Sequence, residues 1–232
     1  MDWNNDGLND IISGDTDGNV WFFENTGTSG NPELAEGVKI EAAGKIIRGK
    51  NKIYKKVGDS YEVDRVVEGN HDLAETYSKI HVADWNKDGK NDLLIGHNNT
   101  VLFYENTGTA GEPALAEPVL VLDSLEAYSR PAPYVFDWDN DGVQDLLTGN
   151  DRGKIHFYRN TGTNKDPELA EAEELTFTGE DFGGRRLRLD ITDWNNDGLI
   201  DVLVGTFTSE KKGDDYSMSG HVWLFRGKEQ QE

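Results

Sequence analysis

Short apolar runs alternate with polar turns along the whole chain. The runs IIS, LLI, LLT and VLV lead to Gly14, Gly96, Gly149 and Gly205, and each predicts a short buried strand. A second strand follows with a shared ending, VWFFENTGT, VLFYENTGT, KIHFYRNTGT or VWLFRG. Third strands (VKIEA, VLVLD, EELTFT) and strands that lead into the next repeat (KIHVADW, YVFDW, LRLDITDW) complete the pattern. The pattern predicts an all-β protein with four strands in each repeat.

A recurring tryptophan gives the length of the repeat. Trp3, Trp85, Trp138 and Trp194 are separated by 82, 53 and 56 residues, so the unit is about 55 residues with one insertion in the first interval. Antiparallel four-stranded units at a fixed period predict the blades of a β-propeller. A β-sandwich fits less well, because its strands do not recur as one repeated pattern. We expect a single repeat domain over residues 1–232, with repeats at about 1–43, 76–128, 129–184 and 185–232 and an insertion at about 44–75.

The strand numbers expected for the four repeats are three, four, four and three. They favour an arc or fragment of a larger propeller, and a small four-bladed ring is the alternative. An arc leaves two strand edges open, and these edges could pair with more chain or with a partner.

A loop of the form Asp-x-Asx-x-Asp-Gly-x-x-Asp precedes the buried strand of each repeat. Ca²⁺ takes six to eight oxygen ligands at roughly 2.3 to 2.6 Å, so side chains on alternate residues converge on one ion only if the backbone curls around it. Positions 1, 3, 5 and 9 supply side-chain oxygens, position 7 supplies a backbone carbonyl, and the glycine at position 6 permits the turn. The expected ligands are Asp2, Asn4, Asp6, Leu8 and Asp10 in loop 1; Asp84, Asn86, Asp88, Lys90 and Asp92 in loop 2; Asp137, Asp139, Asp141, Val143 and Asp145 in loop 3; and Asp193, Asn195, Asp197, Leu199 and Asp201 in loop 4.

An Asx-rich turn that binds nothing is the alternative for any one such loop, since Asp, Asn and Gly are the commonest turn formers. Four copies that all keep an acid at positions 1, 5 and 9 favour metal binding, because a turn does not need three converging carboxylates. Loop 3 carries a fourth carboxylate and is therefore expected to be the tightest site. The tryptophan at position 2 is expected to pack between blades and to shield the ion.

The four loops and the NTGT turns resemble the FG-GAP/VCBS family of calcium-binding β-propeller blades. Such blades occur in integrin heads, in some lectins and in some bacterial polysaccharide lyases. The resemblance covers nearly the whole chain, and it implies the propeller fold and about four Ca²⁺ sites. It does not by itself imply an activity.

Composition narrows the classes of partner and compartment. The net charge is −21, and thirteen of the 44 acidic residues lie in the four loops, which argues against nucleic acid as a partner. No apolar run is long enough for a transmembrane segment. The chain has no cysteine, so calcium rather than a disulfide would hold the blades. Because weak calcium modules fill only where calcium is millimolar, we expect an exported protein that is extracellular, at the cell surface or periplasmic.

Two length anomalies fall at the blade ends opposite the calcium loops: the insertion and an expected long loop from Thr206 to Gly220. The insertion contains KIIRGKNKIYKK, which has six basic residues and no acid. One interpretation is a binding site for an acidic polysaccharide. The other is a solvated hairpin whose lysines balance the charge of the protein's own acidic residues. A protein surface is the other partner considered. The candidate ligand-binding residues are Arg48, Lys50, Lys52, Tyr54, Lys55 and Tyr61.

The sequence contains few signals of catalysis. Whether the protein is an enzyme stays open, and the sequence favours a protein that is not one. The sequence has no Ser/His/Asp order, no HExxH motif and no phosphate loop. A lyase would need a base near a cation, and only His71 and Tyr61 beside the basic insertion qualify. We therefore expect a calcium-stabilised propeller module that acts in carbohydrate or protein binding. A fragment of a polysaccharide lyase or other carbohydrate-active enzyme, and a purely structural spacer, are the alternatives.

Overall fold

The computed structural model describes residues 1–58, 60–68, 76–123, 129–177, 184–212 and 215–228. These residues form antiparallel β-sheets and turns, and none of them lies in a helix that could cross a bilayer. The chain divides into two compact units, Met1–Arg130 and Pro131–Glu232. Each unit is described by itself below.

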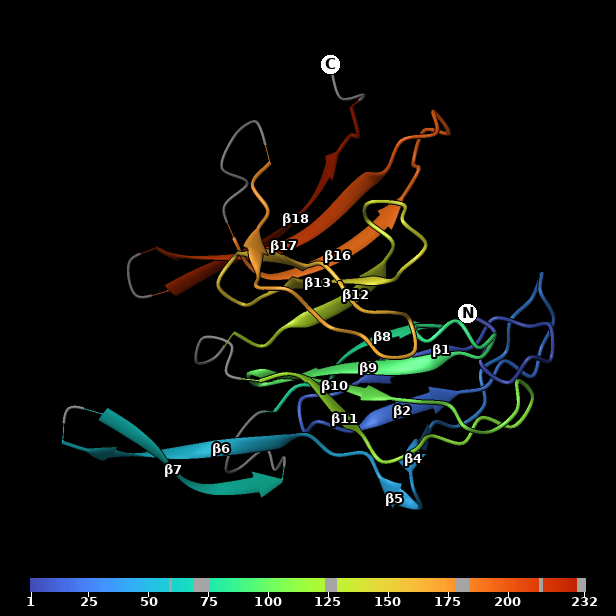
Figure 1. The fold of residues 1–232 in the computed structure, drawn as a ribbon, viewed down its shortest axis with the longest axis horizontal. Coiled ribbons are helices and arrows are strands. Elements are labelled where there is room, and N and C mark those ends of the chain that lie inside the picture. The colour runs from blue at the N-terminus through green and yellow to red at the C-terminus, as the bar shows by residue number, and fades with distance from the viewer. Residues whose placement is uncertain (59, 69–75, 124–128, 178–183, 213–214, 229–232) are drawn as a thin grey trace. The chain divides into compact units, whose positions relative to one another are not determined.

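The first unit contains two sheets and two hairpins (Figure 1). The first sheet has the order β1-β2-β3, and the second has the order β8-β9-β10-β11. The hairpins β4-β5 and β6-β7 lie between them in the sequence. The bounds are β1 Ile11–Gly14, β2 Val20–Phe23, β3 Val38–Lys39, β4 Glu41–Ala42, β5 Lys45–Ile46, β6 Lys50–Val57, β7 Ser60–Glu68, β8 Lys79–Ala83, β9 Asp92–His97, β10 Thr100–Tyr104 and β11 Val119–Leu122.

The second unit contains a four-stranded and a three-stranded sheet. Their orders are β12-β13-β14-β15 and β16-β17-β18. The strands are β12 Ala132–Phe136, β13 Asp145–Gly149, β14 Ile155–Tyr158, β15 Glu173–Glu174, β16 Arg185–Thr192, β17 Asp201–Lys212 and β18 Asp215–Phe225. All pairings are antiparallel.

The all-β fold with four-stranded antiparallel blades is confirmed. The four sheets have three, four, four and three strands in chain order, as the repeats predict. Loops 2, 3 and 4 each join the first and second strands of one sheet, because β8 pairs with β9, β12 with β13 and β16 with β17. The single domain, and the choice between an arc and a ring, stay predictions.

The strand after each metal loop was expected to be buried, and this holds for three repeats. Every residue of β9 and β13 is buried, and most of the first half of β17 is buried. In β1 the expectation is wrong, since its residues are exposed or half-buried and Ile11 is 47% exposed. The reason is that, among the described residues, β1 pairs with β2 alone, whereas β9 and β13 lie between two strands.

Each unit has a core in which one repeat packs against the next. In the first unit, Trp3 of loop 1 belongs to the same buried cluster as Leu93 and Ile95 of β9. In the second unit, Trp138 of loop 3 packs on a buried cluster that includes Val202 and Val204 of β17. Burial of such side chains contributes about 1.5 to 3 kcal/mol each.

The segment from Thr206 to Gly220 is not the loop that was expected. It forms the distal part of a long hairpin in which β17 and β18 stay paired as far as Lys212 opposite Asp215. Thr206 and Thr208 are β-branched residues that favour a strand, and Thr208 and Ser219 share a 2.6 Å hydroxyl hydrogen bond across the strands. The anomaly is therefore an extension of two blade strands at the end away from loop 4.

Candidate metal loops

The carboxylate at position 1 organises each of the four loops in the same way. Its two oxygens accept the backbone N–H groups of positions 5 and 6, at 2.8 to 3.1 Å. The carboxylate at position 5 accepts the N–H of position 7 at 2.8 to 3.0 Å. In loops 1, 2 and 4 the asparagine at position 3 accepts the N–H of position 5 through Oδ1. The sequence therefore folds as nested Asx turns that draw these side chains inward.

Two residues of each loop adopt left-handed backbone conformations that make the curl possible. The glycines at position 6 have φ between 85° and 91°, and the residues at position 4 have φ of 57° to 59°. Asparagine, which tolerates this region, occupies position 4 in three loops, whereas Lys87 occupies it in loop 2. The glycine was predicted from the turn, but the special conformation at position 4 was not.

The aspartate at position 9 has a structural role beyond the one predicted. Asp10, Asp92, Asp145 and Asp201 are all buried, with at most 5% of each residue exposed. One oxygen accepts the N–H of the position 2 tryptophan at 2.9 to 3.2 Å. The other oxygen accepts a backbone N–H from a residue just beyond the second strand of the hairpin that follows the loop, at 2.8 to 2.9 Å. Because the two strands are antiparallel, this carboxylate therefore joins the loop to the end of the second strand, which lies beside it.

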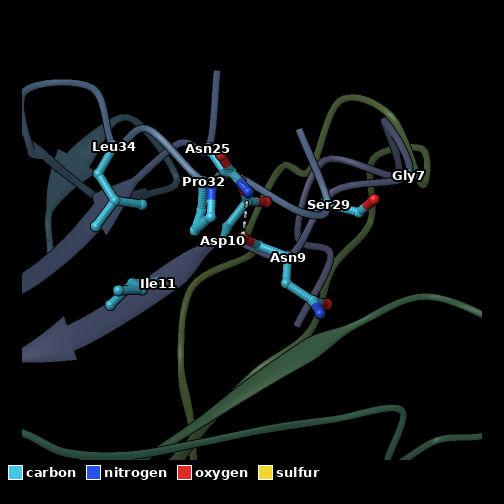
Figure 2. Close-up of a pocket in the computed structure, with 8 residues that line it drawn as sticks. All are labelled: Gly7, Asn9, Asp10, Ile11, Asn25, Ser29, Pro32 and Leu34. Carbon is cyan, nitrogen blue, oxygen red and sulfur yellow. Dashed lines mark hydrogen bonds between the residues drawn. The ribbon is translucent and has the colours of Figure 1, made fainter. Parts of the chain in front are cut away.

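The asparagine of each NTGT turn is the main residue that sequence reasoning missed. Asn25, Asn106 and Asn160 donate the N–H that position 9 accepts, and each is buried. Their own Oδ1 atoms each accept two further backbone N–H groups of the turn at 3.0 to 3.1 Å. Figure 2 shows Asn25 against Asn9 and Asp10, in a pocket of about 440 Å³ beside loop 1. The recurrence of this asparagine in three NTGT turns was the sequence signal that could have indicated its structural role.

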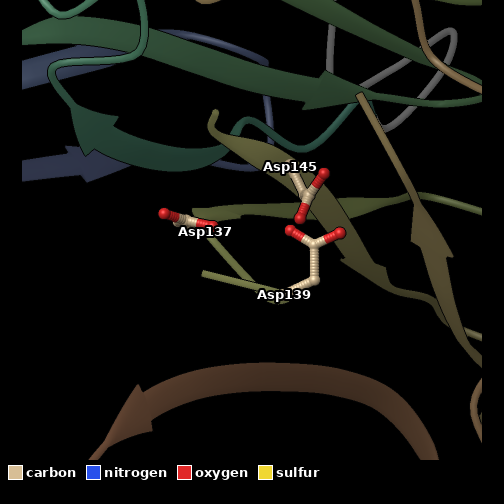
Figure 3. A group of neighbouring side chains, drawn as sticks. All are labelled: Asp137, Asp139 and Asp145. Carbon is tan, nitrogen blue, oxygen red and sulfur yellow. The ribbon is translucent and has the colours of Figure 1, made fainter. Parts of the chain in front are cut away.

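The donor set of each loop fits a hard cation. Each carboxylate or amide oxygen that accepts one N–H keeps a second lone pair, so the inward oxygens remain able to bind an ion. In loop 3, ligand atoms of Asp137, Asp139 and Asp145 lie within 4.8 Å of one another (Figure 3). All the expected side-chain ligands are oxygen donors, the kind that Ca²⁺ and Mg²⁺ prefer.

Burial makes the charged form of the position 9 carboxylates of loops 2 and 3 costly. Desolvation raises the pKa of Asp92 to about 6, against the opposing hydrogen bond from the backbone N–H of Asn106. Desolvation likewise raises the pKa of Asp145. A bound cation would favour the ionised carboxylates and offset this cost.

Two loops also contact basic side chains. Lys90, expected to offer only its backbone carbonyl, also forms an ion pair with Asp88, Nζ to Oδ2 at 3.0 Å. Burial acts to raise the pKa of Asp88, but the hydrogen bond and charge of Lys90 bring it below the usual value. In loop 3, the Arg159 guanidinium forms an ion pair with Asp139. Ligation by these carboxylates competes with their own ion pairs.

The position 2 tryptophans were expected to pack between blades, and Trp3 and Trp138 do so within their own units. Trp3 and Trp85 are buried, and Trp85 meets the ring of Phe103 edge-on with centroids 5.0 Å apart. Trp138 lies against Phe157 at 5.9 Å. Trp194 is 59% exposed, so the expectation is wrong there. Trp3 and Trp138 each pack on the repeat that follows them in the chain.

The residues predicted to bind an acidic polymer are only partly placed. Arg48 and Lys50 are exposed, and Gly49 between them donates its N–H to the Gly18 carbonyl at 2.8 Å, beside the β1–β2 turn. Lys52, Tyr54 and Lys55 lie on β6 and Tyr61 on β7, but their side chains are outside the described residues. His71 is outside the described residues altogether.

The surroundings of this basic run include acids of the protein itself. Lys50 is opposite Glu68 in the β6–β7 register, and Lys55 is opposite Glu62. Lys45, at the start of the run, pairs with Glu117 at 2.8 Å. These placements favour the solvated-hairpin interpretation of the run.

Comparison with known proteins gives the family. The FG-GAP-like repeat matches the chain twice, over residues 84–148 and 137–204. No curated protein matches. Among solved structures, a mutant Tc holotoxin pore of Photorhabdus luminescens is 17% identical with a TM-score of 0.45, over 94% of this chain and 8% of that chain. Because the two family matches together span more than half of its residues, this chain belongs to the FG-GAP-like repeat family.

Proposed function

We propose that this chain is a calcium-stabilised β-propeller module of an exported protein. The observation that carries the proposal is the shared arrangement of the four loops, in which one hydrogen-bond pattern turns side-chain oxygens inward. Desolvation that raises the pKa of Asp92 and of Asp145 supports it, because a cation would offset the cost of keeping these carboxylates ionised. Loops of this kind fill where calcium is millimolar, which favours a place outside the cytoplasm.

In this proposal the ion would be held by oxygens from positions 1, 3, 5 and 9 and by the position 7 carbonyl. When bound, it supplies charge neutralisation and a fixed loop conformation. Position 9 links the loop to the end of the second strand of the hairpin. Each hairpin would thus be fixed at the end where its blade meets the metal.

The module is proposed to bind a carbohydrate or a protein through the blade ends opposite the metal loops. Both length anomalies, the insertion and the β17–β18 extension, lie at these ends. Binding residues are disproportionately found on such variable segments. A polysaccharide lyase fragment is the second candidate, and it would release unsaturated products from a panel of uronate polysaccharides, which ultraviolet absorbance detects.

Replacement of the basic run tests the carbohydrate part of the proposal. If Arg48, Lys50, Lys52 and Tyr54 bind an acidic glycan, replacing all four by Ala removes the cationic contacts, and glycan-array binding in calcium is expected to disappear. The melting temperature should stay unchanged, because Arg48 and Lys50 are exposed.

A control removes positive charges outside both length anomalies. Lys165 and Lys228 are exposed, and their joint replacement by Ala should leave glycan binding intact. Equal binding by the two variants would exclude the basic run as the site.

A further inference from the structure

One residue beside each metal loop differs in charge between the repeats. It directly follows the second strand of the hairpin that comes after the metal loop. It directly precedes the residue whose backbone N–H the position 9 aspartate accepts. We name it the flanking residue: it is Glu24 after β2, Glu105 after β10, Arg159 after β14 and Arg226 after β18. The first unit therefore has two acidic flanking residues, and the second unit has two basic ones.

The acidic flanking residues hold the amide of the position 3 asparagine. Asn4 donates Nδ2–H to Glu24 Oε1, and Asn86 donates Nδ2–H to Glu105 Oε1, both at 3.2 Å. A carboxylate only accepts, so it holds the amide nitrogen and leaves Oδ1 for the loop. A cation needs that oxygen, and the glutamate adds one negative charge beside the site.

The basic flanking residues act in the opposite direction. Arg159 pairs with Asp139, and its guanidinium lies 5.9 Å from the centroid of the Phe157 ring. The extra carboxylate of loop 3 is thus already neutralised.

In loop 4 the flanking residue is not a carboxylate. Asn195 donates Nδ2–H to Asp197 Oδ2 at 2.8 Å. In loop 1, Asn4 makes the same contact to Asp6 Oδ2 at 3.2 Å, in addition to its bond to Glu24.

Arg226 also acts on loop 4 through its charge. Arg226 directly precedes Gly227, whose backbone N–H donates to Asp201 Oδ1 of loop 4 at 2.9 Å, so the residue lies beside this loop. Such a charge repels a second cation near the same carboxylate.

Loops 1 and 4 provide a comparison within one molecule. Their sequences, DWNNDGLND and DWNNDGLID, are identical at every position expected to bind the ion. Their internal hydrogen bonds also correspond, at positions 1, 5 and 9. Their flanking residues differ by two unit charges, since one has Glu24 and the other Arg226.

We propose that the flanking residue sets the calcium affinity of each loop, so that loop 1 binds calcium more tightly than loop 4. The inference rests on the proposed function, that the loops bind calcium at all. It also replaces the expectation that loop 3 is the tightest site, because Arg159 offsets the fourth carboxylate there. Ligand charge is a known determinant of affinity in such sites.

A residue-resolved calcium titration tests the proposal. The N–H groups of Gly7 and Gly198 donate to the position 1 carboxylates of loops 1 and 4, so their amide NMR signals report each loop separately. In the wild-type protein the Gly7 signal should reach its midpoint at a calcium concentration roughly tenfold lower than the Gly198 signal. Glu24→Arg should raise the Gly7 midpoint by about tenfold, and Arg226→Glu should lower the Gly198 midpoint by about tenfold.

Controls separate the possible outcomes. Glu41→Arg makes the same charge change at an exposed residue of β4 and should move neither midpoint. The inference about the flanking residue would be overturned if the wild-type midpoints were equal or if the substitutions left them unchanged. Either result would leave the proposed function standing. Loop signals that do not respond to calcium would overturn the proposed function as well. If Glu24→Arg fails to fold, Arg226→Glu at an exposed residue still decides the matter.

Discussion

Removal of calcium is expected to cost the protein a large part of its folding stability. A ligand that binds only the folded state contributes RT ln(1+[L]/Kd), so about 2 mM calcium on a site with Kd of about 0.1 mM contributes roughly 1.8 kcal/mol. Four such sites contribute about 7 kcal/mol, comparable with the roughly 5 to 15 kcal/mol of an ordinary domain. In EDTA the melting midpoint should fall by roughly 15 °C or more.

Thermal melts in calcium and in EDTA give the measurement. Asp141→Ala is expected to reproduce part of the loss in calcium, because it removes one ligand from loop 3 and leaves the ion underbound. Melting curves that coincide within about a degree or two, with and without chelator, would mean that the loops are turns that do not depend on metal.

Substitution of a position 9 aspartate should destabilise the protein even without calcium. Asp145→Ala leaves two backbone N–H groups, those of Trp138 and Asn160, without the buried carboxylate that accepts them. Each buried group left unsatisfied costs about 1 to 3 kcal/mol, so the free energy of unfolding should fall by about 2 to 6 kcal/mol. Denaturant unfolding in EDTA measures this loss directly.

Asp141→Ala is the matched control for that experiment. Asp141 is exposed, and in the described part of the chain its side chain accepts the N–H of Val143 alone, within the same loop. In EDTA it should therefore change stability far less than Asp145→Ala, whereas in calcium both should weaken loop 3. Equal losses for the two variants in EDTA would contradict the structural role of position 9.

The fold could be predicted from the sequence because its signals repeat. Four copies of one loop and three NTGT turns fixed the register of the repeats, and the strand numbers of the four sheets follow from that register. The predictions of burial were wrong where the burial of a residue depends on a neighbouring strand that the repeat motif does not specify. Ile11 is exposed because, of the strands that the structure describes, β1 pairs with β2 alone, and Trp194 is exposed although its loop matches loop 1.

The candidate metal residues could be predicted, but their environment could not. Spacing alone placed oxygens at positions 1, 3, 5 and 9. It gave no sign that position 9 also accepts two backbone N–H groups, because those donors come from residues 7 positions before it and 14 to 26 positions after it. It also gave no sign that Glu24 or Arg159 reaches position 3, since only hairpin pairing brings them together.

Isothermal titration calorimetry of the chelator-stripped, folded protein with calcium tests the central claim most directly. We expect calcium-specific heat with a stoichiometry that approaches about four, and a stoichiometry lower by about one when the position 1 ligand of a loop is removed by Asp193→Ala. A folded sample that gives no calcium-specific heat would contradict the account.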